Sequence, residues 1–447
     1  MLDGPTRGWN TWNNYQCDIS EDLILEQARA MKALSLHHLY PYIVIDDCWM
    51  APARSSSGEL QADPIRFPNG MKSVAEKVHA EGLLIGLYTS IGQTTCEGLP
   101  ASFGHYELDA ATISGWGFDF LKVDTCGLTF DQTINPAPYY EQMGKALASQ
   151  DRDIVYNVCN WGIWGPWKFA RTFAASWRTT MDIFPTFWRV IQIVDFSEGL
   201  APYSTLHHYN DLDMLEVGVD GTLFNWAWTP KISPLSFDES KAHLTLWAMM
   251  NSPIILGLDL VNLNIDSDIV SLLSNEKLLN LSSDPLQQPA RRQLVKTTGN
   301  LFAPAYHFTG FLQMLPHICL SSDCTYVEIW TKQLEDDALA VMVFNRGSSG
   351  PREVKFSLND DLHYGPCSNL DIEDLWGDGF KYNEAEKIIT TQMIPPQGST
   401  VFTLTPADAS RCYYDGLNHI DANNFKLPSG AIFLLLVIWI ISVNSIK

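Results

Sequence analysis

The chain has 447 residues, of which 46% are hydrophobic and 18% charged, a balance that allows a sizeable core and disfavours global disorder. The formal net charge of -22 argues against nucleic acid or an anionic membrane as the main partner, because phosphate binding needs basic patches and the sequence has no run of Lys and Arg. The length predicts two or three domains, or one large barrel with a smaller companion.

The first 290 residues alternate strand-like and helix-like segments. Helical patterns cover Glu21–Leu34, Met71–His79 and Glu141–Leu147. Five apolar runs and three weaker segments have the pattern of strands: Arg7–Trp12, Tyr42–Ile45, Leu83–Tyr88, Phe118–Val123, Ile154–Val158, Ser176–Thr180, His208–Asp213 and Pro253–Leu258. This alternation favours a parallel sheet, and eight units in this length predict a (β/α)8 TIM barrel over residues 1–290.

Residues 295–406 have a different pattern, in which helical periodicity is nearly absent. Four segments there have the composition of strands and are separated by Gly, Pro, Asp and Asn: Val327–Trp330, Ala338–Phe344, Glu353–Phe356 and Thr400–Leu404. The pattern predicts a small antiparallel β-sandwich domain.

Residues 407–447 form a polar linker followed by an apolar tail at 430–443. The tail is shorter than the roughly 20 residues that span a bilayer. Three interpretations stay open: a short anchor giving weak membrane association, a lipid-anchor signal that is removed, and an error in the gene model. At the other end, Met1–Arg7 lacks the apolar run of a signal peptide, which is expected of a mature or truncated form.

Carboxylates stand where predicted barrel strands end. They are Asp46, Asp47, Asp124, Asp182, Asp211 and Asp213, and Asn160 and Trp161 occupy the equivalent place after a further strand. A single acid there is explained by helix capping, but so many strand ends are not. The carboxyl ends of the strands carry the active site in barrels of this type, so we expect a site rich in carboxylates.

Cleavage of a glycosidic bond needs two carboxyl groups that flank the anomeric carbon. Lys122 lies two residues before Asp124, so both side chains face the same way on a strand and the cation is expected to lower the pKa of Asp124. Arg178 lies four residues before Asp182 and is placed to orient that acid or a sugar hydroxyl. Each pair is also compatible with a purely structural ion pair.

The motifs together resemble those of glycoside hydrolase family 27, the α-galactosidases or melibiases, and are closest in style to fungal and plant members. The resemblance runs in order through residues 8–12 (GWNTW), 45–49 (IDDCW), 66–71 (RFPNGM), 82–88 (GLLIGLY), 116–124 (WGFDFLKVD), 159–162 (CNWG), 176–183 (SWRTTMDI), 210–215 (NDLDML) and 252–257 (SPIILG). It implies a retaining α-galactosidase that needs no cofactor or metal.

The resemblance also implies roles for individual residues. Asp124 matches the nucleophile and Asp182 the general acid and base. Trp12 is expected to stack on the sugar, and the remaining substrate contacts are expected from Asp46, Asp47, Tyr88, Cys96, Lys122, Cys159, Asn160, Trp161, Arg178 and Asp213. The bulky Trp161 favours a free 2-hydroxyl, hence galactose over N-acetylgalactosamine.

The cysteines follow the same resemblance. It pairs Cys17 with Cys48 and Cys96 with Cys126, and it leaves Cys159 as a buried free thiol. Disulfides are typical of an oxidising compartment, so we expect a secreted or extracellular protein, with vacuolar, lysosomal and surface-anchored locations left open. Oligomeric state is not predicted.

Residues 206–234 and 302–324 depart from the family pattern. Three alternatives therefore accompany the main hypothesis: an α-N-acetylgalactosaminidase, a galactose-binding pseudoenzyme, and a metalloenzyme using Asp46 and Asp47. The last lacks clustered His ligands, and no serine hydrolase or phosphate-binding loop motif is present.

Overall fold

The structure is a computed structural model that describes residues 4–220, 234–298, 301–302, 318–319, 325–365, 369–407 and 414. The apolar tail at 430–443, most of the linker, residues 221–233 of the departing stretch 206–234, and most of the departing stretch 302–324 lie outside these residues. The chain divides into two compact units, the described parts of Met1–Ile193 and Ser197–Ala290 in the first and of Val194–Phe196 and Arg291–Lys447 in the second.

The first unit is built on an eight-stranded parallel sheet that follows the order β7-β6-β5-β4-β3-β2-β1-β8. The strands are β1 (Arg7–Asn10), β2 (Tyr42–Val44), β3 (Leu84–Ser90), β4 (Phe120–Asp124), β5 (Val155–Cys159), β6 (Ser176–Arg178), β7 (Tyr209–Asp211) and β8 (Ile254–Leu256). A parallel bridge between Leu215 and Leu256 joins the two edges of the sheet, just beyond β7. The predicted barrel is confirmed, and all eight predicted strands are present.

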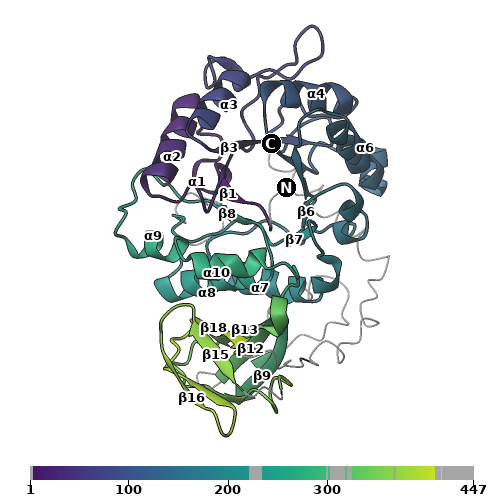
Figure 1. Ribbon diagram of the computed structural model, residues 1–447. Coiled ribbons are helices and arrows are strands. Elements are labelled where there is room, and N and C mark those ends of the chain that lie inside the picture. The colour runs from purple at the N-terminus through teal and green to yellow at the C-terminus, as the bar shows by residue number, and fades with distance from the viewer. Residues whose placement is uncertain are drawn as a thin grey trace. The chain divides into compact units, whose positions relative to one another are not determined.

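Helices cover the outside of this sheet, and Figure 1 shows α2, α3, α4 and α6 arranged around the strands. The helices are α1 (Trp12–Tyr15), α2 (Glu21–Ala33), α3 (Gly70–Ala80), α4 (Tyr106–Trp116), α5 (Phe130–Ile134), α6 (Ala137–Ala148), α7 (Phe187–Glu198), α8 (Phe237–Met249), α9 (Asp268–Leu273) and α10 (Glu276–Asn280). Local sequence sets several of their ends. The Ser20 hydroxyl accepts a hydrogen bond from Leu23 N at the start of α2, and Gly117 ends α4 in the left-handed conformation.

Large aromatic side chains fill the interior of the barrel unit. Trp9, Trp49, Trp177 and Trp247 are all fully buried. Their indole N–H groups are satisfied, for example by Leu258 O for Trp9 and by Tyr88 O for Trp49. These tryptophans therefore belong to the core, where each buries a large apolar surface without leaving a polar group unpaired.

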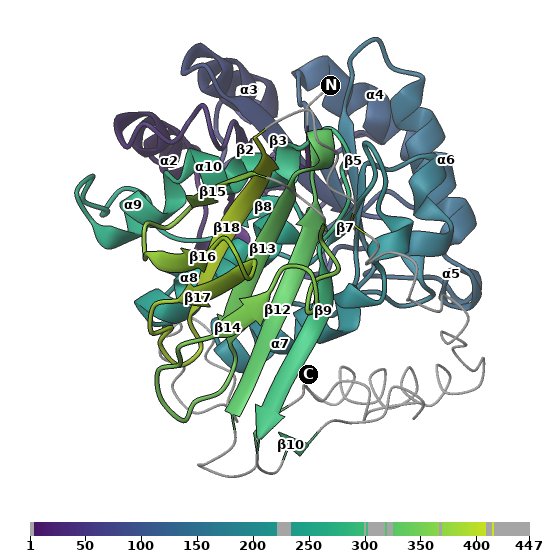
Figure 2. The same ribbon diagram turned by 60° about the horizontal axis from the view of Figure 1, so that its bottom comes forward.

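The second unit contains a five-stranded antiparallel sheet in the order β15-β18-β13-β12-β9 and a three-stranded sheet in the order β14-β17-β16. The strands are β9 (Arg291–Thr298), β12 (Thr325–Gln333), β13 (Leu339–Asn345), β14 (Lys355–Ser357), β15 (Leu370–Asp374), β16 (Phe380–Asn383), β17 (Ile388–Thr391) and β18 (Ser399–Pro406). A separate short pair joins β10 (Leu301–Phe302) to β11 (Ile318–Cys319). Figure 2 shows β9, β12 and β13 side by side.

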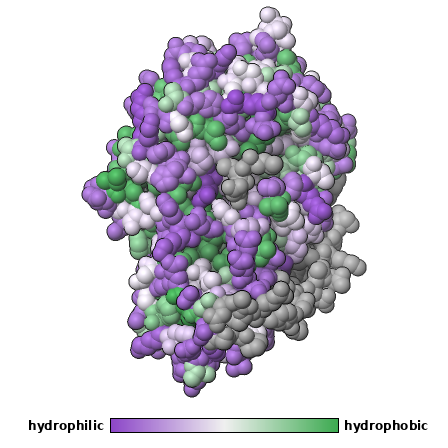
Figure 3. Space-filling view, viewed as in Figure 1, coloured by the Kyte–Doolittle hydropathy of each residue, from purple (hydrophilic) through white to green (hydrophobic). Residues whose placement is uncertain are grey.

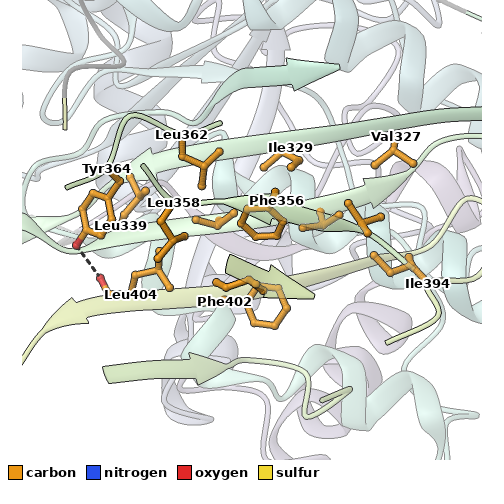
Figure 4. Packing of buried hydrophobic residues seen from close by; sticks show 14 residues of the cluster. Val327, Ile329, Leu339, Phe356, Leu358, Leu362, Tyr364, Ile394, Phe402 and Leu404 are labelled. Carbon is orange, nitrogen blue, oxygen red and sulfur yellow. Dashed lines mark hydrogen bonds between the residues drawn. The ribbon is translucent and has the colours of Figure 1, made fainter. Parts of the chain in front are cut away.

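One hydrophobic cluster holds the second unit together. Ile329 and Phe402 come from the larger sheet, Phe356 and Ile389 from the smaller one, and Leu362 from a connection (Figure 4). Burial of side chains from both sheets against each other is the arrangement of a β-sandwich, and the predicted class of this domain is confirmed.

The face drawn in Figure 3 is predominantly hydrophilic where its residues are described, with the hydrophobic ones in small separate patches. Among the described helices, none combines the length and the apolar composition needed to cross a bilayer.

Candidate active site

The carboxylates predicted at strand ends lie at the same end of the barrel. Asp124 is the last residue of β4, and Asp211 is the last residue of β7. Asp46 and Asp47 follow β2, and Asp182 follows β6. Because all eight strands are parallel, their carboxyl ends open at one mouth, where a (β/α)8 barrel places its catalytic groups.

Asp124 is buried, and two hydrogen bonds fix its carboxylate. The backbone N of Thr125 donates to Oδ1 at 2.7 Å, and the Tyr88 hydroxyl donates to Oδ2 at 3.1 Å. Burial raises the pKa of Asp124 to about 7, Lys122 acts in the opposite direction, and the charge of Asp182 adds to the rise. The predicted lowering effect of Lys122 on the pKa of Asp124 is present, but desolvation of the buried carboxylate outweighs it, so the pKa is raised overall.

Lys122 pairs with Asp46 rather than with the acid on its own strand. Its Nζ lies 2.8 Å from Asp46 Oδ2, which also accepts a hydrogen bond from Asn10 Nδ2 at 2.8 Å. The Thr11 hydroxyl accepts from Asp46 N, and the Lys122 ammonium lies 5.4 Å from the centre of the Tyr88 ring. These contacts hold a charged carboxylate and an ammonium group at the mouth, both suited to binding sugar hydroxyls.

Asp47 links two loops that carry disulfides. Its Oδ1 accepts from Cys48 N at 2.7 Å, and its Oδ2 accepts from Glu97 N at 3.1 Å. Burial raises the pKa of Asp47 to about 6, and the two backbone donors oppose that rise. The carboxylate thus lies between Cys48 of one disulfide and the residue that follows Cys96 of the other.

Arg178 joins the other two predicted acids. Its Nη2 lies 2.7 Å from Asp213 Oδ2 and 3.0 Å from Asp182 Oδ1. Asp213 has φ of +80°, and it also accepts hydrogen bonds from the backbone N of Ile183 and of Met214. Burial raises the pKa of Asp213, and Arg178 opposes this. Arg178 is therefore the predicted orienting group for Asp182.

Asp124 and Asp182 differ sharply in exposure. The Asp124 residue is 5% exposed, whereas 58% of the Asp182 side chain is accessible. The two are near enough for the charge of Asp182 to raise the pKa of Asp124. One acid is thus set deep in the site, and the other lies where a departing group and an incoming water have access.

Both disulfides implied by the resemblance are present, Cys17–Cys48 and Cys96–Cys126, and Cys159 is a buried free thiol. Cys126, Cys159 and Trp161 pack together, with Ile163 and Met181 against them. The sulfurs of Cys96 and Cys126 and a carboxylate oxygen of Asp124 lie within 4.8 Å of one another. These sulfurs are bonded to each other, so they are not free to ligate a metal.

The remaining predicted contacts have distinct settings. Trp12 is half-buried at the start of α1, where its backbone N donates to Asn10 Oδ1 at 2.8 Å. The Tyr88 hydroxyl also lies 3.2 Å from Cys96 Sγ. Asn160 is fully buried, and its Nδ2 donates to Ile163 O at 2.7 Å, so its amide donor is used within its own loop.

Three residues that hold the site together were missed in the sequence. Asn10 positions Asp46, Asn157 donates to Asp211 Oδ2 at 2.8 Å, and Arg189 binds the backbone that carries Asp182. Asn10 stands at the end of β1 inside a family motif, and its strand-end position was a usable signal. Asn157 lies within a strand, and Arg189 lies in a helix, so neither had such a signal.

The chain matches known protein families, curated sequences and solved structures. The family described as "Alpha galactosidase A" matches residues 4–284, more than half of the chain, and the "Alpha galactosidase C-terminal beta sandwich domain" matches residues 325–404. A "Probable alpha-galactosidase" of Dictyostelium discoideum is 33% identical over 90% of this chain and 93% of its own length. "Alpha-galactosidase 2" of Arabidopsis thaliana is 32% identical over 90% of this chain and 89% of its own length.

Solved structures give the same result. The crystal structure of alpha-galactosidase I from Mortierella vinacea superposes with a TM-score of 0.74 at 28% identity, covering 92% of this chain and 99% of that one. A beta-L-arabinopyranosidase from Geobacillus stearothermophilus shares the fold at a TM-score of 0.68 and 20% identity.

Proposed function

The chain belongs to the α-galactosidase family of glycoside hydrolases, and for the double-displacement reaction of that family we propose Asp124 as the nucleophile and Asp182 as the general acid and base. The protein is a retaining α-galactosidase, which hydrolyses terminal non-reducing α-D-galactosyl residues. The carboxylate pair supports the two roles, because one acid is buried and held by fixed donors while the other is exposed and held by a cation.

In the first displacement, the carboxylate of Asp124 attacks the anomeric carbon while Asp182 gives a proton to the departing glycosidic oxygen. The C–O bond to the leaving group breaks, and a covalent galactosyl ester forms on Asp124. Tyr88 and Thr125 N hold the attacking carboxylate in place, so little reorganisation is needed as the bond forms. Attack requires the ionised form of Asp124, which Lys122 favours.

In the second displacement, Asp182 takes a proton from water, and the water oxygen attacks the anomeric carbon of the ester. The bond to Asp124 breaks, and galactose leaves with its original configuration. The exposure of the Asp182 side chain suits both halves of the reaction, since the leaving group must depart and the water must enter on its side.

Sugar recognition falls to the other groups at the mouth. We propose that Asp46, Asp47 and Lys122 bind hydroxyls at the far end of galactose, that Arg178 and Asp213 bind further ring hydroxyls, and that Trp12 covers an apolar face of the ring. Tyr88 and Cys96 form part of the wall. Cys159, Asn160 and Trp161 surround the 2-position. The packing of Trp161 against Cys126 and Cys159 leaves the indole little freedom to make room for an N-acetyl group, which supports galactose as the sugar.

The experiment that tests these roles combines NMR detection of the first anomer released from an aryl α-galactoside with a fluorinated α-galactosyl fluoride that labels the nucleophile. Wild type should release the α-anomer first and be labelled on Asp124. Asp124→Asn should lose turnover and labelling, and Asp182→Asn should lose turnover while keeping slow labelling.

Normal turnover of Asp124→Asn would contradict the assignment. Binding of galactose without turnover by the wild type would instead support a pseudoenzyme. Faster turnover of the aryl N-acetylgalactosaminide than of the galactoside would contradict the proposed sugar.

We also propose that the protein works in a secreted or extracellular setting, on α-galactosides of oligosaccharides, polysaccharides or glycoconjugates. Two disulfides in the barrel unit support an oxidising compartment. Non-reducing against reducing electrophoresis of the protein recovered from culture medium and from cell extract tests this. Fully reduced protein, found only in the extract, would contradict it.

A further inference from the structure

The proposed acid and base is carried by a segment without regular structure. Asp182 lies between the end of β6 at Arg178 and the start of α7 at Phe187, and most of its side chain is exposed. A general acid must lie within hydrogen-bond reach of the leaving oxygen, and small displacements reduce its effect strongly. Such a segment needs anchors that fix its backbone as well as its carboxylate.

Two anchors hold this segment from the side of the pocket. Arg178 Nη2 binds both Asp182 Oδ1 and Thr180 O, the latter at 3.2 Å, and Asp213 Oδ2 accepts from Ile183 N at 2.7 Å. The Met181 side chain packs against the cluster that contains Cys159. These contacts reach the carboxylate and the two flanking residues. The carbonyl of Met181 accepts a hydrogen bond from the Thr180 hydroxyl at 3.0 Å, and the carbonyls of Met181 and Asp182 share one further partner outside the segment.

That partner is Arg189, in the first turn of α7. Its Nε donates to Asp182 O at 2.9 Å, and its Nη2 donates to Met181 O. The third guanidinium nitrogen, Nη1, donates to Gln192 Oε1 on the next turn of the helix. The planar guanidinium thus binds two consecutive carbonyls on one side and is braced by an amide on the other.

Burial and geometry distinguish this arginine from a surface cation. Arg189 is only 6% exposed, and its guanidinium carbon lies 5.9 Å from the centre of the Phe184 ring. No ion pair of Arg189 with a carboxylate is present among the described residues; its hydrogen bonds from the guanidinium go to carbonyl and amide oxygens. A lysine has one nitrogen and lacks the rigid fork that binds two carbonyls at once.

We propose that Arg189 is a positioning residue for the general acid and base: it holds the carbonyl groups of Met181 and Asp182, one on each side of the Asp182 Cα, and so sets where the Asp182 carboxyl group lies. The proposal rests on the role proposed for Asp182. Burial lowers the pKa of Arg189 to about 10, so the guanidinium stays protonated at neutral pH and keeps all three donors.

The test uses two α-galactosides that differ in how much they need the acid. A dinitrophenolate leaving group departs without a proton, whereas an alkoxide leaving group, as in a methyl galactoside, needs one. For Arg189→Ala and Arg189→Lys, we expect kcat/KM on the methyl galactoside to fall by at least about tenfold, and kcat/KM on the dinitrophenyl galactoside to change by less than about threefold. Gln192→Ala removes the brace and should give the same pattern more weakly.

Two variants calibrate the measurement. Asp182→Ala should show the same difference between the two substrates in kcat/KM, but a larger one. Azide, a nucleophile that needs no base, should restore the kcat of this variant on the dinitrophenyl substrate. Arg171→Ala changes an exposed arginine in the same unit and should change neither rate.

The outcomes distinguish the proposed role of Asp182 from the proposed role of Arg189. If Asp182→Ala loses no more rate on the methyl galactoside than on the dinitrophenyl galactoside, the role proposed for Asp182 is wrong. If Asp182→Ala shows the difference but Arg189 variants that unfolding curves show to be folded lose both rates equally, or lose neither, the positioning role of Arg189 is overturned. Because the ratio is measured within each preparation, partial misfolding of Arg189→Ala lowers both rates together. In that case Arg189→Lys and Gln192→Ala test the positioning role. If no folded variant loses more rate on the methyl galactoside than on the dinitrophenyl galactoside, the positioning role of Arg189 is overturned.

Discussion

The Nζ of Lys122 lies 2.8 Å from Oδ2 of Asp46, although Lys122 shares strand β4 with Asp124. Asp46 follows β2, which is separated from β4 by β3 in the barrel, so the lysine reaches across a strand to its partner. Its effect on Asp124 is through space and opposes the rise in pKa that burial causes. One cation therefore serves a proposed sugar-binding acid and the proposed nucleophile together.

Replacing Lys122 with Met should change both roles. The pKa of Asp124 should rise further, because the cation that favours its ionised form is lost, and the acidic limb of the kcat/KM profile should move to higher pH. The loss of Lys122 should also lower kcat/KM at the optimum by at least about tenfold, since the buried carboxylate of Asp46 keeps its hydrogen-bond donors but loses its cation. A pH–rate profile measures both effects.

Lys168→Met is the matched control, because Lys168 is exposed in the same unit. It should leave the position of the acidic limb unchanged. An unmoved limb in Lys122→Met would show that the lysine does not act on the charge of Asp124.

The raised pKa of Asp124 also predicts a cost in stability. The pKa of Asp124 is about 7 in the folded protein against an ordinary value of 3.8, so the folded state holds the proton more tightly than the unfolded state. Asp124 therefore makes folding progressively less favourable as the pH rises from about 4 to about 7. Asp124→Asn cannot ionise, so its free energy of unfolding relative to wild type should grow over that window, by an amount on the order of 3–4 kcal/mol.

Denaturant unfolding at pH 4 and at pH 8 measures this difference. Asp266→Asn provides the control, since Asp266 is an exposed acid of the same unit. It should show the same stability difference from wild type at both pH values. A constant difference between Asp124→Asn and wild type would mean that the Asp124 carboxyl titrates alike in the two states.

The barrel could be predicted from the sequence because its strands are buried on both faces. Tyr42–Val44 is buried at every position and appears in the sequence as an apolar run that ends in acids. The strands of the second unit are harder to predict. Leu370–Asp374 and Phe380–Asn383 alternate between half-buried and exposed residues, and their charged positions hide the strand pattern that packing later selects.

The proposed catalytic pair could be predicted as well, because strand ends and family motifs are local features of the sequence. The raised pKa of Asp124 could not be predicted. Its spacing from Lys122 predicted the lowering effect of the cation on its pKa, which is present, whereas the larger effect of desolvation depends on how the whole barrel encloses the carboxylate. The partner of Lys122 lies 76 residues away along the chain. Arg189 binds backbone carbonyls, which every residue type provides, so no sequence pattern marks its target.

The two disulfides allow a matched comparison of stability and catalysis. Their sequence separations are 31 for Cys17–Cys48 and 30 for Cys96–Cys126, so loop closure predicts a similar loss for removing either, about 3–4 kcal/mol. Their places in the site differ. The sulfurs of Cys96–Cys126 lie within 4.8 Å of the carboxylate of Asp124, and the Tyr88 hydroxyl contacts both Cys96 and Asp124. The backbone N of Cys48 donates to Asp47, a proposed sugar-binding acid, which also accepts at a longer distance from Glu97 N beside Cys96.

Replacing both cysteines of one pair or of the other with Ala should therefore change kcat and KM to different extents. The Cys96/Cys126 variant should lower kcat more than the other variant does, because the wall that holds the proposed nucleophile loosens, and should raise KM less, because Cys48 N still holds Asp47. The Cys17/Cys48 variant should mainly raise KM, because the loop that places Asp47 loosens. Steady-state kinetics on an aryl α-galactoside, at a temperature where unfolding curves show both variants folded, measures the two constants. Equal changes in kcat and KM for the two variants would mean that the disulfides act on the site only through general stability, whereas a split would assign each one to the carboxylate that it adjoins.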